Sequence, residues 1–311
     1  MKEGKMKNKL TQDTAADQVF IVLVYAVLTF IGLMVLLPLL NVVACSFSSS
    51  MAVATYKVYI WPVGLNFRAY REIFNLKEIW LGYGNSFLYM VVGTAINLFV
   101  TILAAYPLSK KNLDGRNIIM VFFTFTMFFS GGLIPEYLVA RGLGLVNNRL
   151  VMIILGALSV YNMIIMRTYF MNSIPAELTE AAEIDGASHI RQLIFIVLPL
   201  SMPVIAVLGL NFAIGHWNGY VKALIYLNDI NKYPLQLIIR DYLLSNRVLE
   251  DILIKSFSGG LYSTENMGEV LGLREVVKYA IIVVATLPMI VIYPFVQRYF
   301  VKGVMIGSLK G

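Results

Sequence analysis

The chain reads Ser-Ile-Pro-Ala-Glu-Leu-Thr-Glu-Ala-Ala-Glu-Ile-Asp-Gly-Ala-Ser-His-Ile-Arg from Ser173 to Arg191. This polar stretch lies between two apolar runs, so it predicts a helix, a turn and a second helix at the face of a membrane. Ser173 can cap the first helix, Pro175 fits its first turn, and Gly186 ends it.

The first of these helices has two different faces. Taking about 100° per residue, one side is small and mostly apolar and the other is acidic. The first side holds Leu178, Ala181, Ala182 and Asp185, and the second holds Glu177, Glu180 and Glu183. A helix this short needs a partner surface, and paired alanines let another backbone approach closely. Ser188 can cap the next helix, and on these residues alone an ordinary interhelical loop is an equal alternative.

The composition indicates that most of the chain is surrounded by lipid. Hydrophobic residues make up 59% of the 311 residues and charged residues 14%, and the mean hydropathy is +0.74. A soluble surface needs more charge than this. The net charge of +7 comes from lysines and arginines scattered between apolar runs, which favours contact with anionic lipid headgroups over nucleic-acid binding.

Six largely uncharged stretches approach the roughly 20 residues that a membrane-spanning helix needs. They are residues 19–46, 86–107, 118–133, 150–166, 193–217 and 279–296. We therefore predict an all-α integral membrane protein with a bundle of six transmembrane helices. The first run is longer than the core of a signal peptide, about 7 to 15 residues, so we interpret it as a retained helix.

The spans divide the chain into segments. We expect a basic tail (1–18), a first transmembrane helix (19–46), an outer loop (47–85), a core of five further spans (86–296) and a C-terminal tail (297–311). The core includes an inner loop at 167–192 and a long outer loop at 218–278. The basic N-terminal tail, the pair Lys110-Lys111 and the acid-free C-terminal tail favour cytoplasmic positions for both termini.

The two outer segments carry further signals. Aromatic residues in 47–85 fit a cover over the bundle and a belt at the lipid interface equally well. In the longer segment an amphipathic helix is predicted after Pro234, and packing against the bundle is favoured over docking of a partner. Its apolar positions are Leu235, Ile238, Ile239, Tyr242 and Leu243.

The quoted stretch resembles the EAA signature of ABC importer permeases. The likeness rests on Glu180-Ala181-Ala182, on Gly186 four residues later, and on Ile196 and Leu198-Pro199. In that family the loop is a coupling helix that docks in a groove of a cytoplasmic ATPase. The resemblance implies ATPase coupling by Glu177, Glu180, Ala181, Ala182, Asp185, Gly186 and Pro199. It also implies a contact of the C-terminal tail with the ATPase through Gly307, Ser308 and Lys310, for which a frayed tail is an equal alternative.

Other short motifs are similar to the carbohydrate-uptake, maltose-type branch of that family. They are Gly131 to Pro135, Leu143 to Leu145, Tyr161-Asn162, His216 to Asn218, Tyr233 to Gln236 and the ending from Gln297 to Gly311. The resemblance implies a multi-pass protein of the cell membrane that imports oligosaccharides, including acidic polysaccharide fragments. It implies as partners a second, homologous permease subunit, two ATPase subunits and an extracytoplasmic solute-binding protein.

No catalytic residue is predicted. The phosphate-binding pattern G-x-x-x-x-G-K-[ST] is missing from the sequence, so ATP and Mg are expected at the partner ATPase and no cofactor on this chain. One cysteine, Cys45, and two distant histidines, His189 and His216, predict no metal site. A secondary, ion-coupled transporter is the alternative, but the predicted spans hold essentially no charged residue away from their ends.

The path of the substrate is predicted from side chains that suit sugars. Hydrogen-bonding groups beside aromatic faces make Tyr161, Asn162, Trp217, Asn218 and Tyr220 the candidates. Buried amides in lipid more often join helices to one another, so a structural use of the asparagines is favoured.

Overall fold

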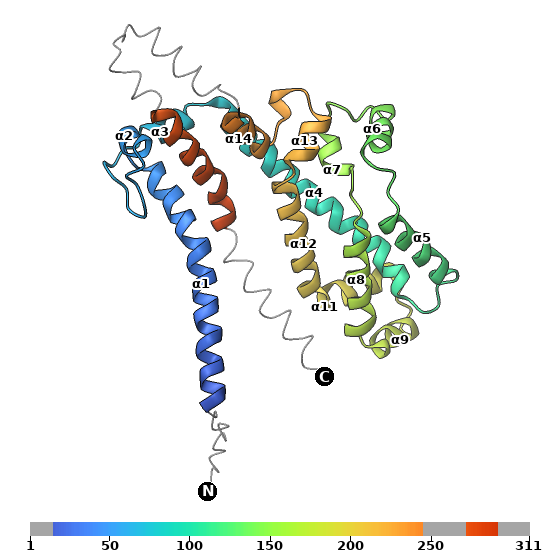
Figure 1. The fold of residues 1–311 in the computed structure, drawn as a ribbon. Coiled ribbons are helices and arrows are strands. Elements are labelled where there is room, and N and C mark those ends of the chain that lie inside the picture. The colour runs from blue at the N-terminus through green and yellow to red at the C-terminus, as the bar shows by residue number, and fades with distance from the viewer. Residues whose placement is uncertain (1–14, 245–271, 292–311) are drawn as a thin grey trace. The chain divides into compact units, whose positions relative to one another are not determined.

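The structure is a computed structural model that describes residues 15–244 and 272–291 (Figure 1). These residues form helices and connecting segments and contain no strand. In chain order the elements are α1 (Ala15–Ser46), α2 (Ser50–Ala54), α3 (Arg68–Phe74), α4 (Lys77–Ser109), α5 (Arg116–Phe128), α6 (Leu133–Gly142), α7 (Leu150–Ile154), α8 (Val160–Ser173), α9 (Ala176–Ile184), α10 (His189–Gln192), the π-helix η1 (Leu193–Val197), α11 (Leu198–Leu200), α12 (Met202–Trp217), α13 (Tyr220–Tyr226), the 3-10 helix η2 (Ile230–Lys232), α14 (Leu235–Leu244) and a helix over residues 272–291.

The chain divides into two compact units. One consists of residues 1–69 with 256–283, and the other of residues 70–255 with 284–311.

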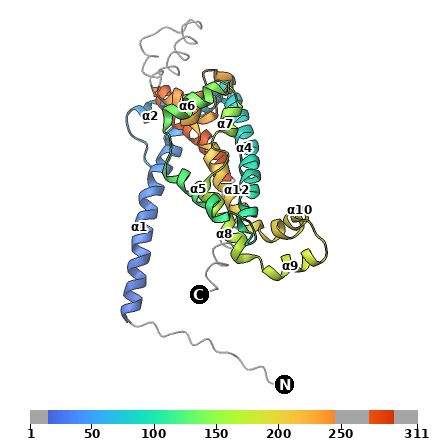
Figure 2. The same cartoon turned by 90° about the vertical axis from the view of Figure 1, so that its right-hand side faces the viewer.

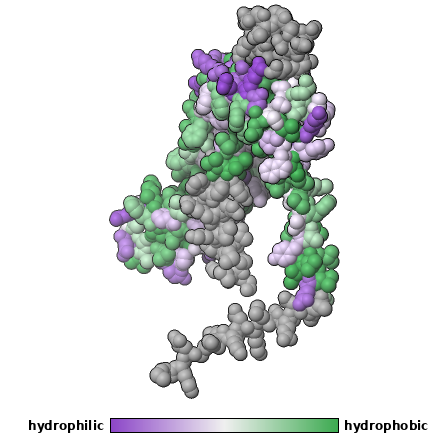
Figure 3. Space-filling model, turned by 90° about the vertical axis from the view of Figure 1, so that its left-hand side faces the viewer, coloured by the Kyte–Doolittle hydropathy of each residue, from purple (hydrophilic) through white to green (hydrophobic). Residues whose placement is uncertain are grey.

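The first unit is dominated by α1, a helix of 32 residues. Its best 18-residue window has a mean hydropathy of 2.9 and is 0% buried, and its surface is mostly hydrophobic in Figure 3. A helix that is apolar on every side fits lipid rather than water. Among the described residues of the unit only the end of α1 is fixed, since Ala44 and Cys45 are buried and Asn41 Nδ2 donates to the carbonyls of Val58 and Tyr59 at 3.0 and 2.7 Å.

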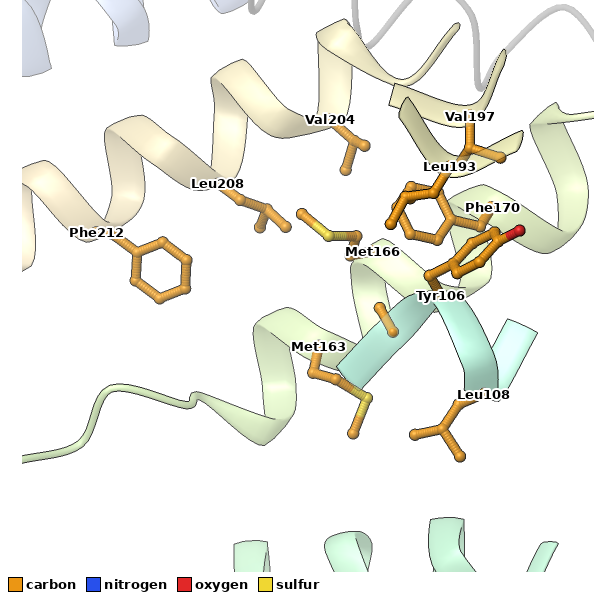
Figure 4. Close-up of a cluster of buried hydrophobic side chains, with 11 residues drawn as sticks. Tyr106, Leu108, Met163, Met166, Phe170, Leu193, Val197, Val204, Leu208 and Phe212 are labelled. Atoms are coloured by element: carbon orange, nitrogen blue, oxygen red, sulfur yellow. The ribbon is translucent and has the colours of Figure 1, made fainter. Parts of the chain in front are cut away.

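The second unit is built around α4. This helix of 33 residues packs against α8, α12 and α14, as Figure 1 shows. Near the end of α4, side chains from α4, α8, η1 and α12 point toward one another in one apolar cluster (Figure 4). A second cluster forms around Tyr89 nearer the start of α4. Burial of these side chains holds the helices together.

Two of the predicted spans are sharply bent. The chain bends by 111° between α5 and α6. It bends by 82° between the helical stretch His189–Leu200 and α12. Gly132 at the first bend has a φ of +81°, which suits glycine. Pro199 lies in α11 before the second bend at Ser201, and Pro203 lies in the first turn of α12 after it, where the lack of an amide hydrogen is tolerated.

The predicted span at 150–166 is divided as well. Residues 150–154 form α7, and α8 begins only at Val160, where Ser159 Oγ accepts a hydrogen bond from the Asn162 amide at 3.4 Å. Between the two helices Gly156 has a φ of +74°, so the helix cannot continue through it.

Over the described residues, two single helices, α1 and α4, have the length and apolar composition to cross a membrane, and the two bent pairs raise this number to four. The six-helix bundle and the cytoplasmic termini stay predictions. The last predicted span, 279–296, is described only to residue 291.

The amphipathic helix expected after Pro234 is confirmed as α14. Leu235, Ile238, Ile239 and Tyr242 are buried, and the helix packs against α4, as the favoured interpretation required. An added Cβ at Gly82 would lie 2.7 Å from Cδ1 of Ile238, so the close approach of the two helices depends on that glycine.

Candidate functional site

The segment from Ser173 to Ser201 projects at one end of the second unit. Figure 2 shows α9 and α10 extending beyond the ends of α4 and α8. The predicted cap at Ser173 is wrong, because this serine is the last residue of α8 and Pro175 occupies the N-cap position of α9. A residue before proline is driven into extended backbone, so Ile174, with φ −105° and ψ 114°, ends α8 and α9 starts after the proline.

The turn after α9 forms as the sequence predicts. Gly186 has a φ of +76°, and the amides of Gly186 and Ala187 donate to the carbonyls of Glu183 and Ala182 at 3.0 and 2.8 Å. Such bonds satisfy carbonyls that the end of a helix leaves free. Ser188 Oγ then accepts from the amide of Arg191 at 3.4 Å and caps α10.

Helix α9 is exposed on the surface of the unit, with no buried residue. Leu178 is 45% exposed, Ile184 is 87% exposed and Ile190, in α10, is 71% exposed. The helix therefore has little core of its own, and apolar side chains are left uncovered beside its glutamates.

The predicted coupling residues lie mostly together. Exposed positions are occupied by Glu177, Glu180, Ala181, Asp185 and Gly186, and Ala182 is half-buried. Pro199 is exposed in α11, on the other arm of the segment. The predicted tail contacts Gly307, Ser308 and Lys310 lie outside the described residues.

A hydrogen-bond network ties this segment to the end of α4. Tyr106 Oη donates to the carbonyl of His189 at 3.1 Å, and Lys110 Nζ donates to Oε1 of Gln192 at 3.1 Å. Gln192, which is 0% exposed, donates in turn from Nε2 to the carbonyl of Ala187 at 3.2 Å. These three side chains are not evident from the sequence, because their role depends on which helix end lies beneath the turn.

A polar cavity of about 230 Å³ lies deeper in the same unit. Its lining comes from α4, from α7 and the segment between α7 and α8, and from α8, α12 and α13. The lining residues are Asn97, Met152, Gly156, Ser159, Asn162, Asn211, Phe212, Gly215, His216, Gly219 and Lys222.

Asn97 connects three walls of this polar cavity. Its Nδ2 donates to the carbonyl of Ala157 at 3.0 Å, and its Oδ1 lies 2.8 Å from Nε2 of His216. Since Oδ1 can only accept, this bond assigns the proton of the imidazole to Nε2. An added Cβ at Gly93, one turn earlier, would lie 2.4 Å from the imidazole, so this glycine makes room for the histidine.

The polar cavity lies part-way along α4, a helix long and apolar enough to cross a membrane. At roughly 1.5 Å per residue, Asn97 is about 18 Å along α4 from Ser109 and about 30 Å from Lys77. It also falls between the two apolar clusters, which involve Tyr89 on one side and Ala105 on the other. A hydrogen-bonding region between two apolar layers is suited to a polar solute that passes along the bundle.

The structure brings one of the five path candidates to the polar cavity. Asn162 is part of the lining. Tyr161 is 61% exposed, Trp217 is only 2% exposed, and Asn218 and Tyr220 are exposed around the end of α12. Lys222 was missed because the sequence assigned residues 218–278 to an outer loop, whereas α13 brings it to the cavity wall.

Over residues 15–244 and 272–291, no group of three or more His, Cys, Asp or Glu side chains could hold a metal ion.

Comparison with known proteins identifies relatives over nearly the whole chain. A family model described as "Binding-protein-dependent transport system inner membrane component" matches residues 79–306. The chain is 37% identical over 295 residues to the polygalacturonan/rhamnogalacturonan transport system permease protein YtcP of Bacillus subtilis (strain 168), covering 95% of this chain and 99% of YtcP. It is 38% identical over 299 residues to protein LplC of the same organism, covering 96% and 97%.

A solved structure is similar as well. It is described as the crystal structure of a bacterial ABC transporter involved in the import of the acidic polysaccharide alginate. The TM-score is 0.80 at 34% sequence identity, and the match covers 92% of this chain and 98% of that chain.

Proposed function

This chain belongs to the family of binding-protein-dependent transport system inner membrane components, and we propose that it is the transmembrane permease subunit of an ATP-driven importer of oligosaccharides. Relatives whose names specify polygalacturonan, rhamnogalacturonan and alginate support acidic polysaccharide fragments as the substrates. The protein is located in the cell membrane and is not itself an enzyme, because ATP is hydrolysed by a separate subunit.

The proposed coupling role rests on one observation. Residues of the EAA signature lie on a short, exposed helix, and hydrogen bonds connect the segment that contains this helix to the bundle. Helix α9 has no buried residue of its own, and the bonds from Tyr106 and Lys110 connect α10, which follows it after one turn, to the end of α4. A partner that moves α9 would therefore move α4. This is the geometry that an ATPase needs in order to switch a bundle between two states.

The complete importer contains, in this proposal, a second homologous permease, two ATPase subunits and an extracytoplasmic solute-binding protein. Both termini and α9 face the cytoplasm, and the long segment after α12 faces outward. ATP and Mg bind at the ATPase subunits and not on this chain. Family membership favours this mechanism over an ion-coupled secondary transporter.

Purification of the tagged chain from its own host in mild detergent tests the proposal. We expect an ATPase and a second permease to co-purify, and ATP hydrolysis in proteoliposomes to rise when a binding protein and an acidic oligosaccharide are added. A chain that lacks an ATPase and still transports after reconstitution would show a secondary transporter instead.

A further inference from the structure

Lys222 brings a positive charge to the wall of the polar cavity. Its Nζ donates to the carbonyl of Leu155 at 2.6 Å, and an added Cβ at Gly156 would lie 3.9 Å from the same atom. An ammonium group carries three donors, and the carbonyl of Leu155 accepts from only one of them. The cavity therefore borders a cation that can donate further hydrogen bonds.

No carboxylate in the described part of the chain forms an ion pair with Lys222. Burial lowers the pKa of Lys222, and the carboxylate of Glu136, in α6, opposes this shift without forming an ion pair. At the depth of Asn97 a charged side chain is expensive to keep, and such residues are usually paired or line a path for a charged solute. An anion that enters the cavity would supply the missing partner.

The rest of the wall suits a sugar. The amides of Asn162 and Asn211 are joined by one hydrogen bond of 3.3 Å, which leaves the NH2 group of one amide and the oxygen of the other unbonded whichever way the pair is oriented. Neither remaining atom bonds to another described residue, and Ser159 adds a hydroxyl nearby. Donors and acceptors of this kind match the hydroxyl groups of a sugar ring.

We infer that Lys222 binds the carboxylate of an acidic sugar unit inside the polar cavity, while the neighbouring amides bind its hydroxyl groups. This inference rests on the proposed function and names the residue that makes the path selective. A carboxylate gains a charge-assisted hydrogen bond from the ammonium group, whereas a neutral sugar of the same shape does not. Lys222 thus sets the preference for acidic over neutral oligosaccharides.

The test uses the complete importer, reconstituted with its ATPase subunits and binding protein. Uptake of trigalacturonate is compared with uptake of its methyl ester, which has nearly the same shape and no charge. We expect Lys222→Gln to lower uptake of the acid by about tenfold or more, the size of one charge-assisted hydrogen bond, and to change uptake of the ester by less than about threefold. Lys222→Arg retains the charge and should retain the preference.

Lys77→Gln is the matched control, because it removes the same charge from an exposed position at the start of α4. Equal loss of acid uptake in Lys77→Gln and Lys222→Gln, or an unchanged preference in Lys222→Gln, would overturn the inference. So would a wild-type importer that takes up acid and ester equally.

Assembly of each variant complex is measured alongside uptake. If Lys222→Gln no longer co-purifies with the second permease, the lysine pairs with an acidic residue of that subunit, and the inference is wrong. If the wild-type complex shows no ATP-dependent uptake of any saccharide, the proposed function itself fails, whatever Lys222 does.

Discussion

Lys110 Nζ lies 3.1 Å from Oε1 of Gln192, and this hydrogen bond joins the residue that follows α4 to the last residue of α10. Gln192 also bonds to the carbonyl of Ala187, just after the turn at Gly186. The end of α4 and the turn after the exposed helix α9 are therefore linked through one buried amide.

Gln192→Leu tests this link. The substitution leaves the carbonyl of Ala187 and the ammonium of Lys110 without their partner, which costs about 1–3 kcal/mol of stability in that region. We expect the ratio of sugar transported to ATP hydrolysed to fall several-fold, measured in proteoliposomes. Arg191→Ala, at the exposed neighbouring position, is the control and should keep the ratio of the wild type. A normal ratio in Gln192→Leu would mean that the bonds are not needed for coupling.

The turn after α9 gives a second prediction. In the combined variant Glu180→Ala and Gly186→Pro, proline cannot adopt the left-handed backbone that Gly186 has at φ +76°. We expect substrate-stimulated ATP hydrolysis to be lost, while membrane insertion and expression stay intact. The ATPase activity of the purified complex, with and without binding protein and sugar, is the measurement. Full stimulation in this variant would refute the coupling role of α9.

A third prediction compares two glycines of α4. Gly93→Ala would bring a Cβ to 2.4 Å from the imidazole of His216, whereas Gly84 has nothing within 4 Å of that position. Displacement of the histidine would break its bond to Asn97, and overpacking of this kind costs about 1–3 kcal/mol. Gly84→Ala should be neutral or stabilise the helix by up to about 1 kcal/mol. Thermal unfolding in detergent, followed by fluorescence, measures both, and equal midpoints would contradict the packing.

Trp217 provides a fourth prediction, because its side chain is only 2% exposed and its ring centroid lies 6.4 Å from that of Tyr83. Truncation of a buried tryptophan costs about 3–5 kcal/mol, so we expect Trp217→Ala to lower the unfolding temperature of the complex. Tyr161→Ala, at a 61% exposed position, should leave it unchanged. Altered sugar selectivity in Trp217→Ala at full stability would instead support its predicted position on the substrate path.

Local signals in the sequence predicted local structure well. The helical spacing of apolar residues after Pro234 predicted α14. Gly186 and Ser188 predicted the turn and the cap, because glycine suits the left-handed backbone of the turn and serine suits the N-cap. The predicted cap at Ser173 is wrong for an equally local reason, because Pro175 drives Ile174 into extended backbone and α9 begins only after the proline.

Features that depend on distant contacts could not be predicted in this way. Apolar content alone suggested a continuous span at 150–166, but Asn97, more than fifty residues earlier, binds the carbonyls of Gly156 and Ala157 where the helix is interrupted. Lys222 was likewise assigned to a loop, because sequence hydropathy contains no information on how far α13 reaches into the bundle.

The exposure of α1 bears on how freely the sequence of this helix can vary. Residues 16–40 of this helix are exposed within the described part of the chain, so length and apolar character matter there more than the identity of each residue. The family model, which begins only at residue 79, leaves this helix out. An unrelated apolar helix as long as residues 15–40, joined just before Asn41, would therefore preserve the hydrogen bonds of Asn41 and the burial of Ala44 and Cys45, and could serve as an exchangeable module in engineered importers.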